Sequence, residues 1–275
     1  MALTFTDADS AVHDLDDVAI FKQRSVRNAG IPPVEHDTQR TPSRDGETYI
    51  DTFIPPRFLI VQLVILGTSW ANLLANRRTL VQALNPTLGV GTLKWTPDAT
   101  VYAIDCILER GVGFSDNRGP QRENATISFR CTNPFWYNPT ANTPTVAGAS
   151  AGLDVPVEVP VDIEGTAGSA VINNTGDVES FPVITLPGYF RDPTITNVTT
   201  GKKVRFVGLT VLSGDTLTID MAARTAKVGS TSVISKLSAD SEMWSLATGN
   251  NTVEVVLEAG AITATVTYFT RFLGV

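Results

Sequence analysis

The sequence predicts a mainly β protein with two domains: an α+β N-terminal domain with one main helix, followed by an antiparallel β-sandwich. Three observations support this prediction. Helical spacing of apolar residues is convincing in one segment only, and short strand-like runs with turns between them fill the second half. The two parts are separated by residues 133–139, Asn-Pro-Phe-Trp-Tyr-Asn-Pro, in which two prolines bracket three aromatic residues. We therefore expect domains at residues 1–138 and 139–275.

The composition is that of a globular protein. A chain of 275 residues is long enough for two domains, and it is 43% hydrophobic and 18% charged. The net charge is −7, with 13 Lys and Arg against 15 Asp and Glu up to Asn138 and 8 against 13 after it. Since neither part is basic, sequence-specific binding of nucleic acid is not expected.

The chain shows no sign of export or membrane insertion. Its first residues lack the basic and apolar regions of a signal peptide. The longest apolar run, residues 58–66, is interrupted by Gln62 and is shorter than the roughly 20 residues of a membrane helix. Cys106 and Cys131 lie in strand-like runs and are expected to be buried thiols. We expect a soluble protein made in the cytosol.

The first 46 residues are polar. Short strands are suggested around Phe5 and over residues 18–21, and residues 31–46 are typical of a loop. The two histidines, His13 and His36, are expected at the surface. Five aspartates could be imagined around calcium, but they lack the glycine and terminal glutamate of an EF-hand loop, so no metal site is predicted; they are Asp7, Asp9, Asp14, Asp16 and Asp17.

Residues 58–67 are rich in β-branched residues and apolar on both faces, which predicts a central strand buried on both sides. A helix should follow, capped by Thr68 or Ser69 and stopped at residues 85–86, Asn-Pro. Arg77 and Arg78 are expected on its solvated side. Its apolar stripe, expected to pack on the sheet, consists of Trp70, Leu73, Leu74, Val81 and Leu84.

Further strands are expected at residues 91–95, 101–113 and 125–131. The polar stretch 114–124 between the last two predicts a hairpin with a long exposed arm, residues 115–123, that is used in assembly. For the aromatic stretch 133–139 two interpretations remain: a packed hinge between domains, or the ordinary end of a core strand.

The second half begins with a linker or edge segment at residues 140–153 and continues with close-set strands, as in a sandwich. The expected strands are residues 155–160, 169–173, 181–186, 194–199, 203–207, 215–220, 225–228, 231–235, 243–246, 252–258 and 262–269.

No catalytic, cofactor-binding or metal-binding residue is predicted. The patterns GxSxG, HExxH, CxxC and the P-loop are absent. A sugar-binding role would use Trp136 and Trp244 as stacking platforms, although both are better explained as core residues. Paired carboxylates of a glycosidase can be imagined on any sandwich, and the set here is not specific; it comprises Glu158, Asp162, Glu164, Asp220 and Glu254.

Several segments, in the expected order, resemble the siphophage distal tail protein (Dit) family, the baseplate hub at the tip of a long tail. They are residues 54–60 leading to Gly67, 78–86, 91–93, 133–137, 173–177 with 181–184, 214–220, and 244–246 with 249–251. The resemblance is weakest over residues 1–46.

The resemblance implies a ring-forming N-terminal domain and a galectin-like sandwich. It further implies a structural virion protein without catalytic residues or cofactors, at the tail tip. There a homohexameric ring would join the tail tube protein to the tail-associated hub or fibre protein, with the tape measure protein as a further partner. The genome would pass through the lumen without specific binding. The alternative from a different class is a carbohydrate-binding adhesin module that recognises host polysaccharide.

Overall fold

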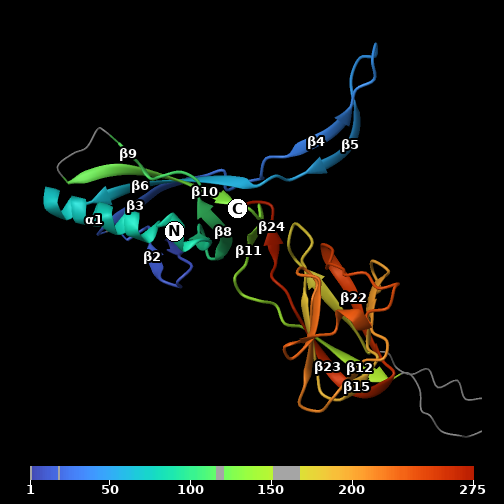
Figure 1. The fold of residues 1–275 in the computed structure, drawn as a ribbon. Coiled ribbons are helices and arrows are strands. Elements are labelled where there is room, and N and C mark those ends of the chain that lie inside the picture. The colour runs from blue at the N-terminus through green and yellow to red at the C-terminus, as the bar shows by residue number, and fades with distance from the viewer. Residues whose placement is uncertain (1, 18, 116–120, 151–167) are drawn as a thin grey trace, which may run out of the picture. The chain divides into compact units, whose positions relative to one another are not determined.

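The computed structural model describes residues 2–17, 19–115, 121–150 and 168–275. The chain forms two compact units (Figure 1). The first comprises Met1–Pro139 together with Phe272–Val275, and the second comprises Thr140–Arg271. The mainly β fold class is confirmed, with α1 (Trp70–Ala83) as the single α-helix of the described residues.

The first unit is built on one antiparallel sheet in which β6 and β10 pair over ten residues each, from Arg57 to Leu66 and from Cys131 to Arg122. Two short strands, β9 (Gly113–Phe114) and β11 (Trp136–Tyr137), pair with β10 and β8. The strand order is β2 (Val12–Asp14), β1 (Ala2–Thr6), β7 (Gly91–Thr96), β8 (Tyr102–Leu108), β10 (Arg122–Cys131), β6 (Arg57–Leu66) and β3 (Phe21–Arg27).

Alternation along β6 and β10 creates the core of the first unit. Ile127, Phe129 and Cys131 point inward as the sequence predicts, and the ring of Phe129 stacks on Phe5 with centroids 5.5 Å apart. The expectation that the strand at residues 58–67 is buried on both faces holds only near its end, where Leu63 to Ile65 are consecutively buried. At the other end Phe58 is 42% exposed. The strand is therefore buried on one face where it begins and on both faces where it meets α1.

Helix α1 begins where the sequence predicts. Ser69 is the N-cap, and its hydroxyl accepts a hydrogen bond from the backbone N–H of Asn72 at 3.2 Å. A Cβ at Gly67 would lie 2.7 Å from the backbone nitrogen of Leu73, so only glycine lets the helix start this close to the end of β6. The helix ends at Ala83, and Asn85 caps the short 3₁₀ helix η1 (Pro86–Leu88) that follows.

The predicted apolar stripe of α1 is wrong in part. The residues that pack on the sheet are Leu73, Leu80, Ala83 and Leu84. Trp70, Leu74 and Val81 are 45%, 41% and 49% exposed and form a second apolar line. The sequence contains two lines of helical spacing, 73–80–84 and 70–74–81, on neighbouring faces of one helix. The sheet packs on the first line.

We expect Trp70→Ala to lower the free energy of unfolding by less than about 1 kcal/mol, since substitutions of half-exposed residues cost little. Leu73→Ala, the matched change on the buried line, should cost roughly 2–5 kcal/mol because it leaves a cavity. Urea unfolding of both variants checks this. A larger loss for Trp70→Ala than for Leu73→Ala would mean that the helix is rotated from the orientation described here.

The predicted exposed arm at residues 115–123 is wrong at its end. Strand β10 already begins at Arg122, and Glu123 is buried. Its carboxylate lies 3.5 Å from Nη1 of Arg77, and the Arg77 guanidinium lies 3.8 Å from the ring centroid of Phe114. Arg77 is thus half-buried over the sheet and not on the solvated side of the helix. Residues 116–120, the tip of the predicted arm, lie outside the described residues.

A different element projects instead. Residues 31–46, predicted as a loop, contain strand β4 (Glu35–Gln39), which pairs with β5 (Thr48–Phe53) to form a two-stranded antiparallel sheet. Figure 1 shows this hairpin extending away from the main sheet of its unit. Strand β4 is polar at every position and exposed throughout, so it lacks the alternation from which strands are predicted.

Residues Phe272–Val275 return to the first unit, beyond the predicted division at 138/139. The backbone N–H of Val275 donates to the carbonyl of Ala29 at 3.0 Å, and the buried Arg57 donates to the carbonyl of Leu273. The indole N–H of Trp136 donates to the same Ala29 carbonyl at 3.1 Å. Trp136 is fully buried, so the aromatic stretch ends in the core of the first unit.

The second unit is a set of strands around one core that includes Phe190, Phe206 and Trp244. Its strand pairs are antiparallel except for one parallel pair, between residues 149–150 and 256–257. The hydrogen-bonded order is β17 (Lys202–Arg205), β16 (Thr194–Asn197), β22 (Gly249–Leu257), β12 (Thr145–Ser150), β23 (Ala259–Thr267), β14 (Val183–Pro187), β19 (Thr216–Asp220), β20 (Thr225–Val228) and β21 (Thr231–Ser232). Strand β13 (Gly168–Asn174) pairs with β22, while β15 (Phe190–Arg191) pairs with β18 (Thr210–Val211) and β23; the short helix η2 (Ile234–Lys236) follows β21.

Two sequence predictions fail in this unit. The expected linker 140–153 contains β12, because its Thr, Val, Ala and Gly residues are completed into a sheet by β23 and β22. The expected strand 243–246 is instead irregular, with one bridge between Leu246 and Ser180. It is nonetheless buried at Trp244 and Leu246, so apolar content there reflects packing and not pairing. The expected strand 155–160 lies outside the described residues.

Candidate assembly surface

The side chains of the N-terminal aspartates stabilise turns by accepting backbone hydrogen bonds. Carboxylate oxygens of Asp7, Asp14 and Asp17 accept hydrogen bonds from backbone N–H groups two to four residues further on, and Asp16 accepts from Gln23. Hydrogen bonds from His13 and from the Ala11 backbone lower the pKa of Asp7. Within the described ranges no three His, Cys, Asp or Glu side chains are grouped as a metal site would need. His13 is half-buried and bonds Asp7, whereas His36 is exposed.

The two thiols are structural. Cys106 and Cys131 are both buried, as the sequence predicts, and no disulfide joins them. The hydrogen bond with Cys131, together with burial, raises the pKa of the Cys106 thiol well above its ordinary value. A thiol held in its neutral form is a poor nucleophile, so Cys106 carries no chemistry at neutral pH.

The carboxylates considered for a glycosidase are not brought together in the part of the chain that the structure describes. Asp220 lies at the end of β19 and accepts the backbone N–H of Ala223 at 2.8 Å. Glu254 lies on β22, which is not adjacent to β19 in the sheet. Glu158, Asp162 and Glu164 lie outside the described residues.

Neither candidate sugar platform is accessible. Trp136 is fully buried in the first unit, and Trp244 is 1% exposed in the core of the second. A stacking platform must present the face of its ring to solvent. Both tryptophans are therefore core residues, and the adhesin interpretation loses the two residues on which it rested.

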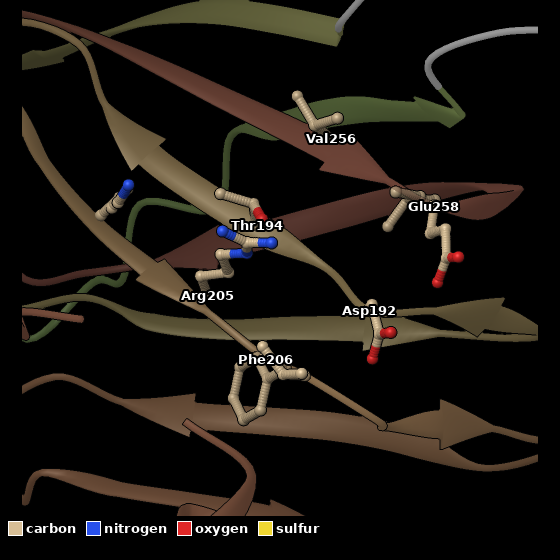
Figure 2. A pocket seen from close by; sticks show the side chains of 9 residues that line it. Asp192, Thr194, Arg205, Phe206, Val256 and Glu258 are labelled. Atoms are coloured by element: carbon tan, nitrogen blue, oxygen red, sulfur yellow. The ribbon is translucent and has the colours of Figure 1, made fainter. Parts of the chain in front are cut away.

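The second unit has an open pocket of about 570 Å³ beside strands β16 and β17 (Figure 2). Thr194 and Arg205 face each other on the neighbouring strands, with Asp192 and Glu258 further along. The full lining is Asp192, Thr194, Lys203, Arg205, Phe206, Val207, Val256, Leu257 and Glu258.

Most charges at this pocket are engaged within the fold. Asp192 accepts the backbone N–H of Leu209 at 2.7 Å, and Glu258 lies 3.6 Å from Arg191. Lys203 lies 2.7 Å from Asp240, and their hydrogen bond lowers the pKa of Asp240. The only ring in the lining, Phe206, belongs to the buried core. The pocket therefore offers neither a stacking surface nor a free acid–base pair.

The hairpin of β4 and β5 is the most exposed element of the first unit. All its strand residues are exposed except Thr52, which is half-buried. Tyr49, Ile50 and Phe53 are 59%, 54% and 57% exposed. Three apolar side chains at more than half exposure on one short hairpin are unusual for a free surface and typical of a contact surface.

One face of the hairpin is internally ordered. Nδ1 of His36 lies 2.8 Å from the hydroxyl of Thr52, and the Tyr49 hydroxyl lies 2.7 Å from the same atom. The rings of His36 and Tyr49 meet edge to face with centroids 6.1 Å apart. These contacts hold the aromatic side chains in place without burying them, so the surface is preorganised.

Asp37 and Asp51 stand directly opposite each other across β4 and β5. Like charges in this position destabilise a strand pair. Among the described residues neither carboxylate has an ion-pair partner: Asp51 accepts only the backbone N–H of Thr52. The pair is therefore an unneutralised acidic site within an apolar surface.

The second apolar surface of the first unit is the exposed line of α1, Trp70, Leu74 and Val81. Beyond Val81 it continues into a pocket of about 390 Å³. The pocket is lined by Val81, Leu84, Pro86, Leu108, Glu109, Arg110, Gly111, Val112 and Phe114. We call the line and this pocket together the helix surface.

Sequence reasoning missed the hairpin and placed the helix surface in the core. The same signal in the sequence indicates the hairpin and the helix surface. Each element has more apolar residues than fit on a single buried face. On α1 this is the second helical line, and on β5 it is Tyr49-Ile50 with Phe53 inside an otherwise polar segment.

None of the described helices has the length and hydropathy needed to span a bilayer. The mainly β chain exposes apolar surfaces on two elements of its first unit. Residues 175–272 match the sequence model of the siphovirus-type tail component, C-terminal domain. No curated protein sequence matches the chain.

Solved structures extend the similarity to the whole chain. The SPP1 Dit protein, described as a paradigm of hub adsorption apparatus in phages that infect Gram-positive bacteria, aligns with a TM-score of 0.75. It is 16% identical, over 99% of this chain and 100% of that one. Two structures of the phage p2 baseplate in its activated conformation, with Ca and with Sr, align at 12% identity with a TM-score of 0.52. Each alignment covers 96% of this chain and 97% of the other. The predicted resemblance to the Dit family is thus confirmed in sequence over residues 175–272 and in fold over both units.

Proposed function

We propose that the chain is a structural virion protein at the distal end of a long non-contractile phage tail. There it forms a homohexameric hub ring that joins the tail tube protein to the tail-associated hub or fibre protein. The observation that carries this proposal is the alignment with a Dit hub protein across both units, with 99% and 100% of the two chains covered. A likeness confined to the sandwich would support a shared domain, whereas this one extends to the complete architecture.

Two different surfaces on one unit support a ring. A closed ring requires a heterologous contact, in which one patch meets a different patch on the next copy. The hairpin and the helix surface are two such patches, and both belong to the first unit. We therefore assign ring formation to the first unit.

Charge supports passage of the genome without retention. The chain carries a net charge of −7, so a lumen formed by it repels phosphate more than it attracts it. The DNA and the tape measure protein would then pass through the ring without specific binding. The protein would have no cofactor and no hydrolytic activity, and it would be synthesised in the host cytoplasm before incorporation into the virion.

Immunogold labelling of purified particles tests the location. Antibodies raised against the second unit should place gold at the end of the tail that is distal to the capsid. Particles that lack tails provide the control and should remain unlabelled. Gold on the capsid, or along the whole tail, would contradict a role at the tail tip.

A further inference from the structure

We propose that the hairpin of one copy lies on the helix surface of the next copy in the ring, with Asp37 and Asp51 facing Arg78. The inference rests on the proposed function in one respect: it takes a ring of identical copies as given and identifies the two surfaces that meet. Beyond the ring, it names the surface of the next copy on which the hairpin lies.

The hairpin needs a partner for physical reasons. A two-stranded sheet alone is marginally stable in water. Among the described residues, its side-chain hydrogen bonds and ring contacts join residues of the hairpin to one another. It also exposes Tyr49, Ile50 and Phe53, and it places two carboxylates opposite each other. A partner that offers both apolar area and positive charge would remove each of these costs.

The helix surface offers both. Trp70, Leu74 and Val81 form an apolar line along one face of α1. Arg78 lies one turn beyond Leu74, is exposed, and has no ion-pair partner among the described residues. Arg77, by contrast, is engaged by Glu123 and Phe114. Arg78 is thus the cation that α1 itself leaves available, and Arg110 at the pocket is a second exposed arginine of the helix surface.

The charges of the two surfaces are complementary. Residues 35–53 contain five carboxylates and two arginines, whereas residues 70–83 of α1 contain two arginines and no carboxylate. The pocket adds Arg110 and Glu109, and Glu109 lies 4.0 Å from Arg130. A pair of carboxylates across two strands matches the forked donors of an arginine. Complementary charge of this kind also fixes the register in which two surfaces meet.

Charge reversal on the full chain tests the proposal. Arg78→Glu and Asp51→Arg should each weaken the association of copies by at least about tenfold, because each places like charges together at the contact. The mass distribution is followed by sedimentation velocity over a range of concentrations. Lys227→Glu, an exposed reversal on the second unit, serves as the matched control and should leave association unchanged. Circular dichroism melts verify that every variant is folded.

Mixing the two single variants distinguishes contact between copies from contact within one chain. In a mixture, Asp51 of the Arg78→Glu copy meets Arg78 of the other, and the two reversed charges meet each other. Rings should therefore reappear in the mixture at concentrations at which neither variant forms them alone. If the hairpin bound the helix of its own chain, mixing would restore nothing, while the double variant would behave as the unmodified protein does.

The outcomes separate this inference from the proposed function. Rings that survive both single reversals, or singles that mixing does not rescue, would overturn the hairpin–helix contact and leave the hub ring standing. An unmodified chain that remains monomeric at every concentration would count against the ring itself, and with it against the contact. A different phage protein that binds the hairpin in place of a second copy would also overturn the inference.

Discussion

Deletion of the hairpin should convert the proposed hexamer into a monomer without unfolding either unit. Residues 35–53 would be replaced by a short Gly-Ser link between Val34 and Ile54. None of the deleted residues belongs to the core cluster of the first unit, and all but Thr52 are exposed. The main sheet therefore keeps its interior, while the copy-to-copy surface is lost. Static light scattering should show the mass of a single chain, somewhat below the 29.5 kDa of the unmodified one.

A shorter deletion provides the control. Replacing residues 41–46, the exposed turn between the two strands, by a two-residue turn keeps Tyr49, Phe53 and both aspartates in place. This variant should still form the ring. A full hairpin deletion that remains hexameric would show that the ring is held by other surfaces, and that the exposed hairpin serves a different partner.

Trp136→Ala should lower the free energy of unfolding of the first unit by roughly 3–5 kcal/mol, the usual cost of emptying a large aromatic site. The side chain is fully buried, and its indole N–H donates to the Ala29 carbonyl. Its ring lies 6.2 Å from that of Trp95, measured between centroids. The substitution removes the packing and also leaves the Ala29 carbonyl with fewer donors.

Urea unfolding should be followed with probes in each unit, because a two-domain chain need not unfold in one step. The transition of the first unit should shift to lower urea, and that of the second should remain. Trp136→Phe, which keeps the ring volume in part but removes the donor, should cost less. A loss below about 1 kcal/mol for Trp136→Ala would contradict the position of this residue in the core.

Much of the fold follows from local sequence. The start of α1 could be predicted because Ser69 caps it directly after the apolar run that ends at Gly67. The inward face of β10 could be predicted because Ile127, Phe129 and Cys131 alternate with polar residues. In both cases the signal lies within a few residues of the feature, and distant contacts agree with it.

The features that were missed depend on distant partners. Strand β12 pairs with β23 and β22, more than a hundred residues away, and its own residues resemble a linker. Burial of Arg57 is offset by carbonyls of Asn28, Ala29 and Leu273, which no local pattern reveals. Which of two helical lines on α1 is buried depends on how the sheet meets the helix. Spacing alone could not decide between them, so Trp70 was placed in the core.

The candidate surface was the least predictable part. The absence of catalytic patterns indicates no position for a contact site. Length alone favours residues 114–124 over residues 31–46 as the exposed element that makes contacts. The two differ in their apolar residues: the hairpin carries Tyr49, Ile50 and Phe53 at its second strand. Exposed apolar residues within a polar segment are a better indicator of assembly than length alone.

Electron microscopy of the purified full-length chain tests the central claim most directly. The account predicts closed hexameric rings with an open lumen in class averages, and loss of those rings when the hairpin is deleted. Particles that are uniformly monomeric, or open filaments without closure, would contradict the claim that this chain is a hub ring.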